Sequence, residues 1–254
     1  MQINLSGKIA LVTGATGELG RVMARTLAQC GADVAVHYHR NEERAATLCR
    51  DIEVLGRRAC AVQADVTQET DVQSMRATVT RELGAPHIIV NNAVAQYQPW
   101  TNVLEQSLED YESQFRSCVL HNVLMAQTFV PAMVDAKWGR VIGINTDCAM
   151  QNFASQSAYV SGKRGMDGVL RVLAREVGEH GITVNQVAPG WMISDKYRKS
   201  GRESAPAYEE RVPLKRRGED QDIANAVAFL ASDLAGFISG VYLPVCGGNV
   251  MPGI

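Results

Sequence analysis

Tyr159 and Lys163 are the two residues whose types and spacing most directly suggest chemistry, within the segment "SAYVSGKRG" at positions 157–165. Positions i and i+4 of a helix lie on one face, so a helix here places the lysine ammonium near the phenol. A nearby positive charge favours the ionised phenol and lowers its pKa, which makes Tyr159 a candidate acid or base. A tyrosine and a lysine at this spacing also occur by chance on exposed helix faces. The meaning of the pair therefore depends on the residues that accompany it.

A glycine-rich turn, "TGATGELG" at positions 13–20, follows a short apolar run and precedes a helical pattern. Glycines let the backbone turn tightly and approach a pyrophosphate, while the amides at the helix N-terminus face the phosphate charge. Between a strand and a helix, this pattern predicts a dinucleotide-binding turn, and a purely structural turn is the alternative. The candidate cofactor contacts in the turn are Thr13, Gly14, Gly17, Leu19 and Gly20.

The end of the second apolar run, "HYHRNEE" at positions 37–43, bears on which dinucleotide binds. An acidic residue at this place accepts hydrogen bonds from ribose hydroxyls, whereas a basic residue accommodates a 2′-phosphate. Here His39 and Arg40 come first, and no carboxylate precedes Glu42. The sequence therefore favours NADP(H) over NAD(H), the alternative being that Arg40 is only a solvated cation.

Short apolar runs alternate with helical patterns along the whole chain, which predicts a parallel sheet with helices on both faces. We expect a single Rossmann-like α/β domain over residues 1–254, doubly wound through right-handed crossovers. About seven strands are expected, at residues 8–14, 33–39, 58–66, 87–93, 139–147, 181–190 and 240–248. A long helical region is expected from about Ser107 to Ala136.

In such sheets, ligands bind beyond the carboxyl ends of the strands, where the strand order reverses. Polar and small residues follow the third, fourth, fifth and sixth predicted strands at that edge. They are Asp65 and Val66, Asn92 and Ala93, Thr146, and Pro189 and Gly190. This grouping at one edge predicts that these residues help to form the cofactor and substrate site.

Composition excludes several other classes of protein. The 254 residues carry a formal net charge of −2 with no basic stripe, so no nucleic-acid partner is expected. The N-terminal apolar run is too short for a signal peptide or a membrane span, so a cytoplasmic protein without membrane partners is expected. Six scattered cysteines without a C-x-x-C pair predict neither a disulfide framework nor a metal site.

Taken together, these motifs resemble those of the short-chain dehydrogenase/reductase family over essentially the whole chain. The resemblance rests on the turn at 13–20, "ADV" at 64–66, "NNA" at 91–93, Tyr159 with Lys163, "PG" at 189–190, and the stretch from "PLKRRGE" to "GG" at 248. It implies an NADP(H)-dependent oxidoreductase that interconverts a carbonyl and a secondary alcohol by hydride transfer. Tyr159 would be the acid/base, and Lys163 would lower its pKa and hold the nicotinamide ribose.

The resemblance also implies a homodimer or homotetramer, formed through the long helices after the fourth and fifth strands and through the C-terminal strand. The apolar tail "GVYLPVCGGNVMPGI" is a candidate contact, although it could equally complete its own sheet. The binding partner is expected to be a small carbonyl or alcohol substrate.

Two catalytic positions depart from the family pattern. Thr146 stands thirteen positions before Tyr159, where the family has a serine that bonds the substrate oxygen, and its hydroxyl keeps the same donor and acceptor. Cys118 stands where the family has a water-holding asparagine, and a thiol is only a weak donor and acceptor. His121 or Asn122, one turn away, could replace that asparagine only if the helix is locally rewound.

Three further residues near the expected site are unusual for the family. Glu18 replaces the middle glycine of the turn, and Val94 replaces the glycine after "NNA". A carboxylate near a pyrophosphate is repulsive unless it points away, and valine adds bulk near the nicotinamide. Asp147 is interpreted as a solvated loop residue, with a contact to a substrate hydroxyl as the alternative.

Substrate choice is expected to lie in residues 190–213, a mobile lid rich in polar and charged side chains. Lys196, Arg198, Lys199 and Arg202 are candidates to meet an anionic or sugar-like substrate, although a solvated surface is the default interpretation. The alternative function is a nucleotide-binding protein of this type with weak or no catalytic activity. Retention of both Tyr159 and Lys163 argues against it, and an assay of hydride transfer separates the two.

Overall fold

Seven apolar segments pair into one sheet in the computed structural model, which describes residues 2–95 and 97–253. The strands are β1 (Ile9–Val12), β2 (Asp33–Tyr38), β3 (Ala59–Gln63), β4 (Ile88–Asn91), β5 (Gly139–Ile144), β6 (Ile182–Pro189) and β9 (Tyr242–Val245). All neighbours run parallel in the order β3-β2-β1-β4-β5-β6-β9, which confirms the expected doubly wound sheet. Because the order reverses between β1 and β4, their carboxyl ends flank the topological switch point.

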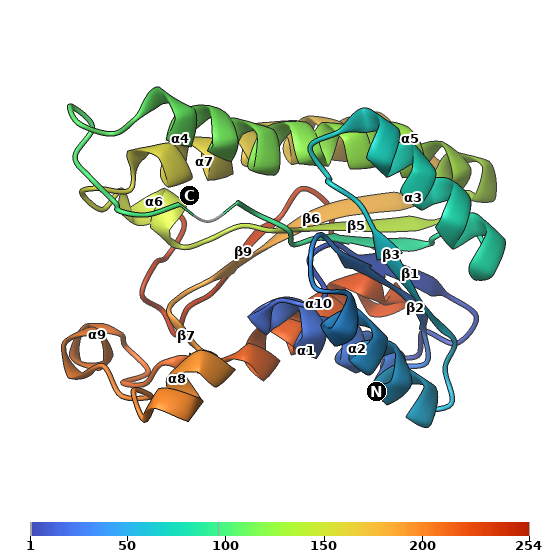
Figure 1. Cartoon of the computed structure of the whole chain (residues 1–254), viewed down its shortest axis with the longest axis horizontal. Coiled ribbons are helices and arrows are strands. Elements are labelled where there is room, and N and C mark those ends of the chain that lie inside the picture. Colours follow the sequence, from blue (N-terminus) through green and yellow to red (C-terminus); the bar gives the residue numbers. More distant parts are fainter. Residues whose placement is uncertain (1, 96, 254) are drawn as a thin grey trace.

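Helices cover both faces of the sheet, so five of its strands are buried along their whole length. One face carries α1 (Glu18–Gln29), α2 (Glu42–Val54) and α10 (Asp220–Ala231), and the other carries α3 (Glu69–Glu82), α4 (Leu108–Gln114), α5 (His121–Ala136) and α7 (Ser157–Val177) (Figure 1). Successive strand residues point to opposite faces, so Leu11 and Val12 belong to different halves of the core.

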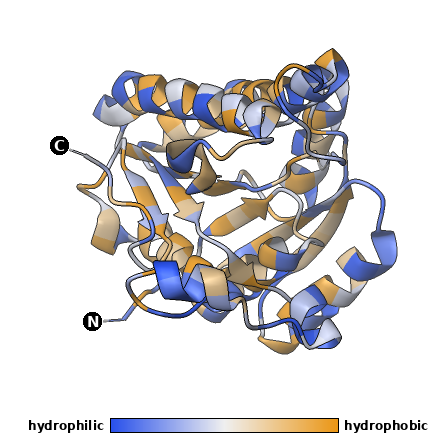
Figure 2. Cartoon of the chain, turned by 90° about the vertical axis from the view of Figure 1, so that its left-hand side faces the viewer, coloured by the Kyte–Doolittle hydropathy of each residue, from blue (hydrophilic) through white to orange (hydrophobic). Residues whose placement is uncertain are grey.

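The helices are amphipathic, and Figure 2 shows hydrophilic and hydrophobic residues alternating along the long helices above the sheet. Strand register also matters for the site, because Val12 lies opposite both Val36 and Val90. The loops that follow these three strands therefore lie side by side at the carboxyl edge, and the loop after β2 begins two residues farther along because β2 continues to Tyr38.

The long helical region expected from Ser107 to Ala136 is present, and it contains a feature that the sequence did not predict. Residues Phe115–Leu120, between α4 and α5, form a π-helical segment. By length and composition alone, Leu108–Ala136 is apolar enough to cross a membrane. Met125, Phe129 and Met133 of this helix are nevertheless buried against the sheet, so the core of the fold accounts for much of its apolar character.

The segment predicted as a lid contains two helices, α8 (Asp195–Ser200) and α9 (Pro206–Arg211), at the carboxyl end of the sheet (Figure 1). The short strand β7 (Met192–Ile193) pairs in parallel with β8 (Gly218–Glu219) at the base of this segment. The remaining elements are α6 (Cys148–Gln151) and the 3-10 turns Gly178–His180 and Asp233–Ala235. The C-terminal strand β9 pairs with β6 and completes the sheet of its own chain.

Candidate active site

A cavity of about 990 Å³ lies along the carboxyl edge of the sheet and spans the switch point between β1 and β4. His39 and Arg40, after β2, line one part of it, and Tyr159 and Lys163, on α7, line another. The other predicted site residues that line it are Gly14, Gly17, Leu19, Asp65, Val66, Asn92, Ala93, Thr146, Pro189 and Gly190. The fold thus brings loops from six strands and one helix into a single cleft.

Two predicted cofactor contacts, Thr13 and Gly20, do not line this cleft. The Thr13 hydroxyl oxygen accepts hydrogen bonds from the amides of Asn92 at 2.9 Å and Ala93 at 3.0 Å. A Cβ on Gly20 would lie 2.2 Å from the carbonyl oxygen of Gly14. These residues therefore shape the glycine turn and hold it to the loop after β4, and their direct contact with a cofactor stays a prediction.

The N-terminus of α1 fits a phosphate group. Gly17 is its N-cap and supplies no side-chain hydrogen bond, so the first amides of this 12-residue helix lack a side-chain cap. Gly14 adopts a φ of +62°, and a Cβ there would approach Ala93 Cα to 3.1 Å. Glycine is required for this turn, and the exposed amides and helix dipole favour an anion such as a pyrophosphate.

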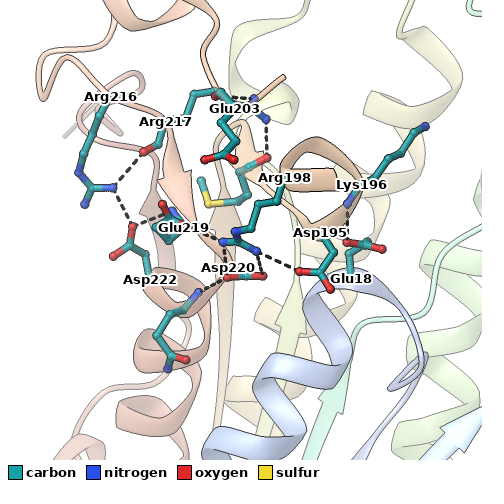
Figure 3. A network of polar contacts seen from close by, with 12 residues as sticks. Glu18, Asp195, Lys196, Arg198, Glu203, Arg216, Arg217, Glu219, Asp220 and Asp222 are labelled. Carbon is teal, nitrogen blue, oxygen red and sulfur yellow. Dashed lines mark hydrogen bonds and ion pairs between the residues drawn. The ribbon is translucent and has the colours of Figure 1, made fainter. Parts of the chain in front are cut away.

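Glu18, the carboxylate of the glycine turn, faces the lid segment. Its Oε2 accepts a hydrogen bond of 3.4 Å from the backbone amide of Lys196 (Figure 3). Next to it, Arg21 pairs with Asp195 at 2.7 Å. Glu18, which stands where the family pattern has a glycine, thus connects the turn to the lid segment.

His37, which the sequence analysis did not single out, ties three parts of the cleft together. Its Nδ1 accepts a hydrogen bond from the amide of Gly14 at 2.9 Å, and its Nε2 lies 3.0 Å from the carbonyl oxygen of Ala64. Burial lowers the pKa of His37 to about 4, so the ring is neutral at pH 7 and Nε2–H can donate to that carbonyl. Only its position at the end of β2, two residues before His39, could have drawn attention to it.

Arg40 occupies the part of the cleft where a 2′-phosphate is expected. Its guanidinium forms no ion pair within the described residues, and Asn41 beside it caps α2 by accepting a hydrogen bond from the amide of Arg44 at 2.9 Å. The carbonyl of His39 accepts a hydrogen bond from Gln63 Nε2 at 3.0 Å, which fixes the backbone here. The local structure leaves the Arg40 charge available to a bound anion.

Lys163 is buried, with 3% of its surface exposed, and its Nζ donates a hydrogen bond of 2.6 Å to the carbonyl oxygen of Ile144. The Nζ atom lies 5.9 Å from the centroid of the Tyr159 ring. Burial lowers the pKa of Lys163. An ammonium has three N–H donors, so two remain for a ribose or a water in the cleft.

Tyr159 differs from expectation in the direction of its pKa shift. Burial raises the pKa of the phenol, and a side-chain hydrogen bond with Thr146 only partly opposes this effect. The net shift is therefore opposite to the lowering expected from Lys163, because desolvation of the phenolate is the largest effect on this group. At neutral pH the phenol is protonated and is a proton donor.

Cys118 lies in the π-helical segment and is 1% exposed. Its Sγ is 3.9 Å from Gln114 Oε1, a weak contact. Asn122 could replace the missing asparagine only if the helix were locally rewound, and the π-helical segment is such a rewinding. Both ends of the Asn122 amide are nevertheless already hydrogen-bonded within the protein. Its Nδ2 donates to the Cys118 carbonyl at 2.7 Å, and its Oδ1 accepts from Asn91 Nδ2 at 2.8 Å.

His121, the other candidate substitute, is also buried beside this segment. Its Nδ1 lies 3.2 Å from the carbonyl oxygen of Ser117, and burial lowers the pKa of the ring to about 3. His121 is therefore a neutral core residue at pH 7. The π-helix places the polar side chains at 121 and 122 against backbone groups and β4.

Asp147 is not the solvated loop residue that the sequence suggested. Only 3% of its surface is exposed, and its Oδ2 accepts hydrogen bonds of 2.8 Å from both Gln151 Nε2 and Asn249 Nδ2. Burial raises the pKa of this carboxyl. Asp147 instead joins α6 to the C-terminal tail, because a carboxylate removed from water must be hydrogen-bonded.

A second cavity, of about 650 Å³, adjoins the first and shares Thr146, Tyr159 and Gly190 with it. Aromatic side chains dominate its wall, and they are Tyr97, Trp100, Phe153, Trp191, Tyr197 and Tyr208. Val94, the bulky replacement for glycine, lines only the first cavity. The shared hydroxyl groups place this aromatic cavity where a substrate would meet Tyr159.

The cations predicted to meet the substrate lie elsewhere. Arg198 forms ion pairs with Asp195 at 3.3 Å, with Asp220 at 2.9 Å and with Glu219, and these carboxylates raise its pKa (Figure 3). The side chain of Arg217 donates to backbone carbonyls of the lid segment, including that of Met192 at 2.6 Å. The two arginines thus attach the segment to the rest of the fold.

The other lid cations also miss the aromatic cavity. Lys196 and Lys199 line a separate cavity of about 920 Å³ beside α1 and α2, and Arg202 lines neither this nor the aromatic cavity. Arg211, from the same segment, does line the aromatic cavity. Arg211 was not predicted from the sequence, because no motif near position 211 distinguishes this arginine from the other lid cations.

Comparison with known proteins agrees with this geometry. Residues 14–249 match the model of a family described as "Enoyl-(Acyl carrier protein) reductase". The chain is 35% identical over 253 residues to the 3-oxoacyl-[acyl-carrier-protein] reductase FabG of Staphylococcus epidermidis, covering 96% of this chain and 99% of that protein. It is 33% identical over 250 residues to FabG of Pseudomonas aeruginosa, covering 98% and 100%.

A solved structure is similar over the same length. The structure described as "Promiscuous Reductase LugOII Catalyzes Keto-reduction at C1 during Lugdunomycin Biosynthesis" superposes with a TM-score of 0.89 at 30% identity. The match covers 98% of this chain and 100% of the other. Both comparisons thus find proteins whose descriptions name reductases.

Proposed function

Since this chain belongs to the short-chain dehydrogenase/reductase family and is an oxidoreductase, we propose that it transfers a hydride between NADP(H) and a carbonyl or secondary alcohol. One observation carries this proposal. A single cleft connects the glycine turn and Arg40 with the Tyr159, Thr146 and Lys163 side chains, and the aromatic cavity opens beside those same hydroxyls.

The residues present fit such a cofactor, which would supply the hydride when bound. The uncapped amides of α1 would hold the pyrophosphate, and Arg40 with His39 would meet a 2′-phosphate. Lys163 keeps two donors for the nicotinamide ribose while its third is held by the Ile144 carbonyl. NADP(H) is therefore the proposed cofactor in preference to NAD(H).

Tyr159 and Thr146 act on the substrate oxygen. Reduction of a ketone leaves negative charge on that oxygen, so a positioned donor must supply a proton. The Tyr159 phenol, whose pKa burial raises above its ordinary value, is protonated at neutral pH, and the Thr146 hydroxyl beside it can hold the carbonyl in place.

A direct test is to follow NADPH absorbance while a panel of ketones is added to the purified protein. Oxidation of NADPH that depends on the ketone supports the proposal. The alternative function, a nucleotide-binding protein without turnover, is favoured if NADPH binds in a fluorescence titration but no ketone is reduced. Ketone reduction with NADH but not with NADPH would instead contradict the assignment of NADP(H) as the cofactor.

The Cys118→Asn substitution is expected to raise the turnover rate or broaden its pH profile without changing cofactor affinity. An asparagine amide is a full donor and acceptor able to hold a water near Lys163, whereas the thiol makes only the weak contact to Gln114. Turnover measured against pH for both forms checks this expectation.

Cys118→Ser is the matched control, because it changes polarity at nearly constant size. If Cys118→Asn turns over at an unchanged or lower rate with normal cofactor affinity, the thiol leaves no gap in proton delivery. A lower melting temperature for Cys118→Asn would then show that the amide overpacks this buried helix position.

We further propose that the protein forms a homodimer or homotetramer through the outer face of α5 and α7. This face contains a cavity of about 580 Å³ lined mainly by apolar side chains, and Val172 within it is 55% exposed. Light scattering is expected to show an oligomer, and Val172→Glu is expected to shift the mass toward the monomer because it places a charge in an apolar contact. Val54→Glu, the same change at the exposed end of α2, should leave the mass unchanged.

The remaining expectations from the sequence also stand as proposals. Residues 190–213 are proposed as a lid over a single domain, since Gly190, Met192 and Ser194 line the cofactor cleft. Helix α8 of this segment is held by ion pairs in this structure, so its movement would have to break the contacts of Arg198. A cytoplasmic location is likewise a prediction.

A further inference from the structure

The aromatic cavity beside Tyr159 is built from three separate parts of the chain. Tyr97 and Trp100 come from the loop after β4, Phe153 follows α6, and Trp191, Tyr197 and Tyr208 come from the lid segment. A volume of about 650 Å³ lies within the range of pockets that hold a drug-sized ligand. What such a pocket accepts depends on how its rings are oriented.

One wall contains a ring that stacks on the catalytic tyrosine. The ring of Trp100 is nearly parallel to that of Tyr159, with an interplanar angle of 17° and 6.4 Å between centroids. Tyr97 stands against Trp100 at 6.4 Å, and its hydroxyl accepts a hydrogen bond of 3.2 Å from the amide of Tyr159. A flat group whose carbonyl reaches Tyr159 would therefore meet an extended aromatic surface on this side.

The lid segment supplies a second wall whose rings are fixed by hydrogen bonds. The Tyr208 hydroxyl accepts from the Trp191 amide at 3.0 Å, and Trp191 Nε1 donates to the Tyr197 hydroxyl at 3.2 Å. Trp191 packs edge-on against both tyrosines, at 5.5 Å and 6.1 Å between centroids. These rings are positioned before any substrate arrives, so they favour a rigid partner over a flexible chain.

Arg211 adds a positive charge to this cavity. Its guanidinium lies over the rings of Phe153 at 5.3 Å and Tyr208 at 5.5 Å, and Nε donates to Asn249 Oδ1 at 3.3 Å. It forms no ion pair within the part of the chain that the structure describes. The nearby Asp147 carboxylate already accepts hydrogen bonds from Gln151 and Asn249. The outer nitrogens of Arg211 are thus oriented by stacking and available to an anion.

Building on the reductase function proposed above, we propose that the substrate is a ketone attached to or fused with a flat aromatic ring system that carries an acidic group. The carbonyl lies between Tyr159 and Thr146, the rings stack on Trp100, and the acidic group pairs with Arg211. The reaction leaves the ring unchanged: a hydride forms the new C–H bond, the carbonyl π electrons move to oxygen, and Tyr159 supplies the proton.

The test compares α-tetralone, a bicyclic aryl ketone, with cyclohexanone and with the N-acetylcysteamine thioester of 3-oxobutanoate, using the intact protein and NADPH. The expected kcat/KM for α-tetralone is at least about 10-fold above that for either of the other two. The Trp100→Leu variant is expected to lose about 10-fold in kcat/KM for α-tetralone and less than about 2-fold for cyclohexanone. A general disturbance of Tyr159 would instead lower both values equally.

The acidic group is tested with ring-carboxylated derivatives of α-tetralone. At least one derivative is expected to have a KM about 10-fold below that of the parent ketone, and Arg211→Gln should remove this advantage without changing KM for the parent. Arg202→Gln, a matched change of a lid arginine outside the cavity, should have no effect. A melting curve for each variant separates unfolding from a change in recognition.

The outcomes distinguish this inference from the function on which it rests. Equal or faster reduction of the thioester or of cyclohexanone would overturn the aromatic substrate while leaving the reductase function intact. The proposed acidic group would be contradicted in two cases. Either no carboxylated derivative has a lower KM than the parent ketone, or the lower KM persists in Arg211→Gln. Failure to reduce any ketone, with NADPH still bound, would instead count against the reductase function itself.

Discussion

Replacement of Tyr159 by phenylalanine is expected to lower ketone turnover by roughly 10²- to 10⁴-fold, the usual contribution of a positioned general acid. The substitution removes the hydroxyl and keeps the ring, so the stacking with Trp100 and the position of α7 should persist. Cofactor affinity should stay nearly unchanged, because Lys163 and the glycine turn are untouched. Steady-state NADPH oxidation and a fluorescence titration of NADPH measure the two quantities on the same preparation.

Tyr111→Phe is the matched control for this experiment. It also deletes one phenolic hydroxyl near the start of α7, where Tyr111 lies 2.6 Å from the Ser157 hydroxyl, but Tyr111 lines neither the cofactor cleft nor the aromatic cavity. Turnover in this variant should stay within about 3-fold of the parent, as for most changes outside a site. If Tyr159→Phe kept most of its activity, the tyrosine mechanism would have to be abandoned.

Replacement of Arg40 by alanine is expected to weaken NADPH binding by about 10- to 100-fold, because charge-assisted hydrogen bonds to a phosphate are lost. NADH lacks the 2′-phosphate, so its affinity should change little. The unmodified protein should accordingly bind NADPH more tightly than NADH. Dissociation constants for both nucleotides, measured at one stated ionic strength, test the prediction, since salt screens this interaction.

Arg44→Ala serves as the control, because Arg44 lies in the first turn of α2 and lines the neighbouring cavity instead of the cofactor cleft. It should alter the overall charge without changing the preference between the two nucleotides. His39→Ala should weaken NADPH binding less than Arg40→Ala, since an imidazole cannot form the paired charge-assisted hydrogen bonds that a guanidinium forms with a phosphate. Equal or reversed affinities of the unmodified protein for NADPH and NADH would refute the assignment.

The chemistry of Tyr159 depends on a balance that spacing alone cannot predict. The i and i+4 relation places Lys163 on the correct helix face, but its Nζ lies 5.9 Å from the ring centroid and bonds the Ile144 carbonyl. Burial of the phenol raises its pKa, and this is the largest effect on the group. Spacing alone identified the candidate residue but not the net direction of its pKa shift.

Much of the architecture could be predicted because its signals are local. Each buried parallel strand is a short apolar run, each covering helix has its own periodic pattern, and the glycine turn needs glycine at Gly14 for its positive φ. These constraints act within a few residues of chain, so the strands and the doubly wound parallel class of the sheet follow from the sequence. The clustering of Asp65, Asn92 and Gly190 in one cleft follows in turn from the parallel topology.

Other features arise only when distant segments pack together, and these the tertiary structure decided. Asp147 is buried because Asn249, 102 positions away, donates to it, and His37 matters because its ring bonds the Gly14 amide. The sequence likewise named Arg198, and not Arg211, as a candidate substrate contact, although ion pairs with Glu219 and Asp220 hold Arg198 away from the aromatic cavity that Arg211 lines. Residue types and short-range periodicity thus determined the fold and the place of the proposed reaction at the carboxyl edge of the sheet. Solvation, hydrogen-bond partners and the direction of each side chain depend on neighbours in space, so only the folded chain decided pKa values and substrate contacts.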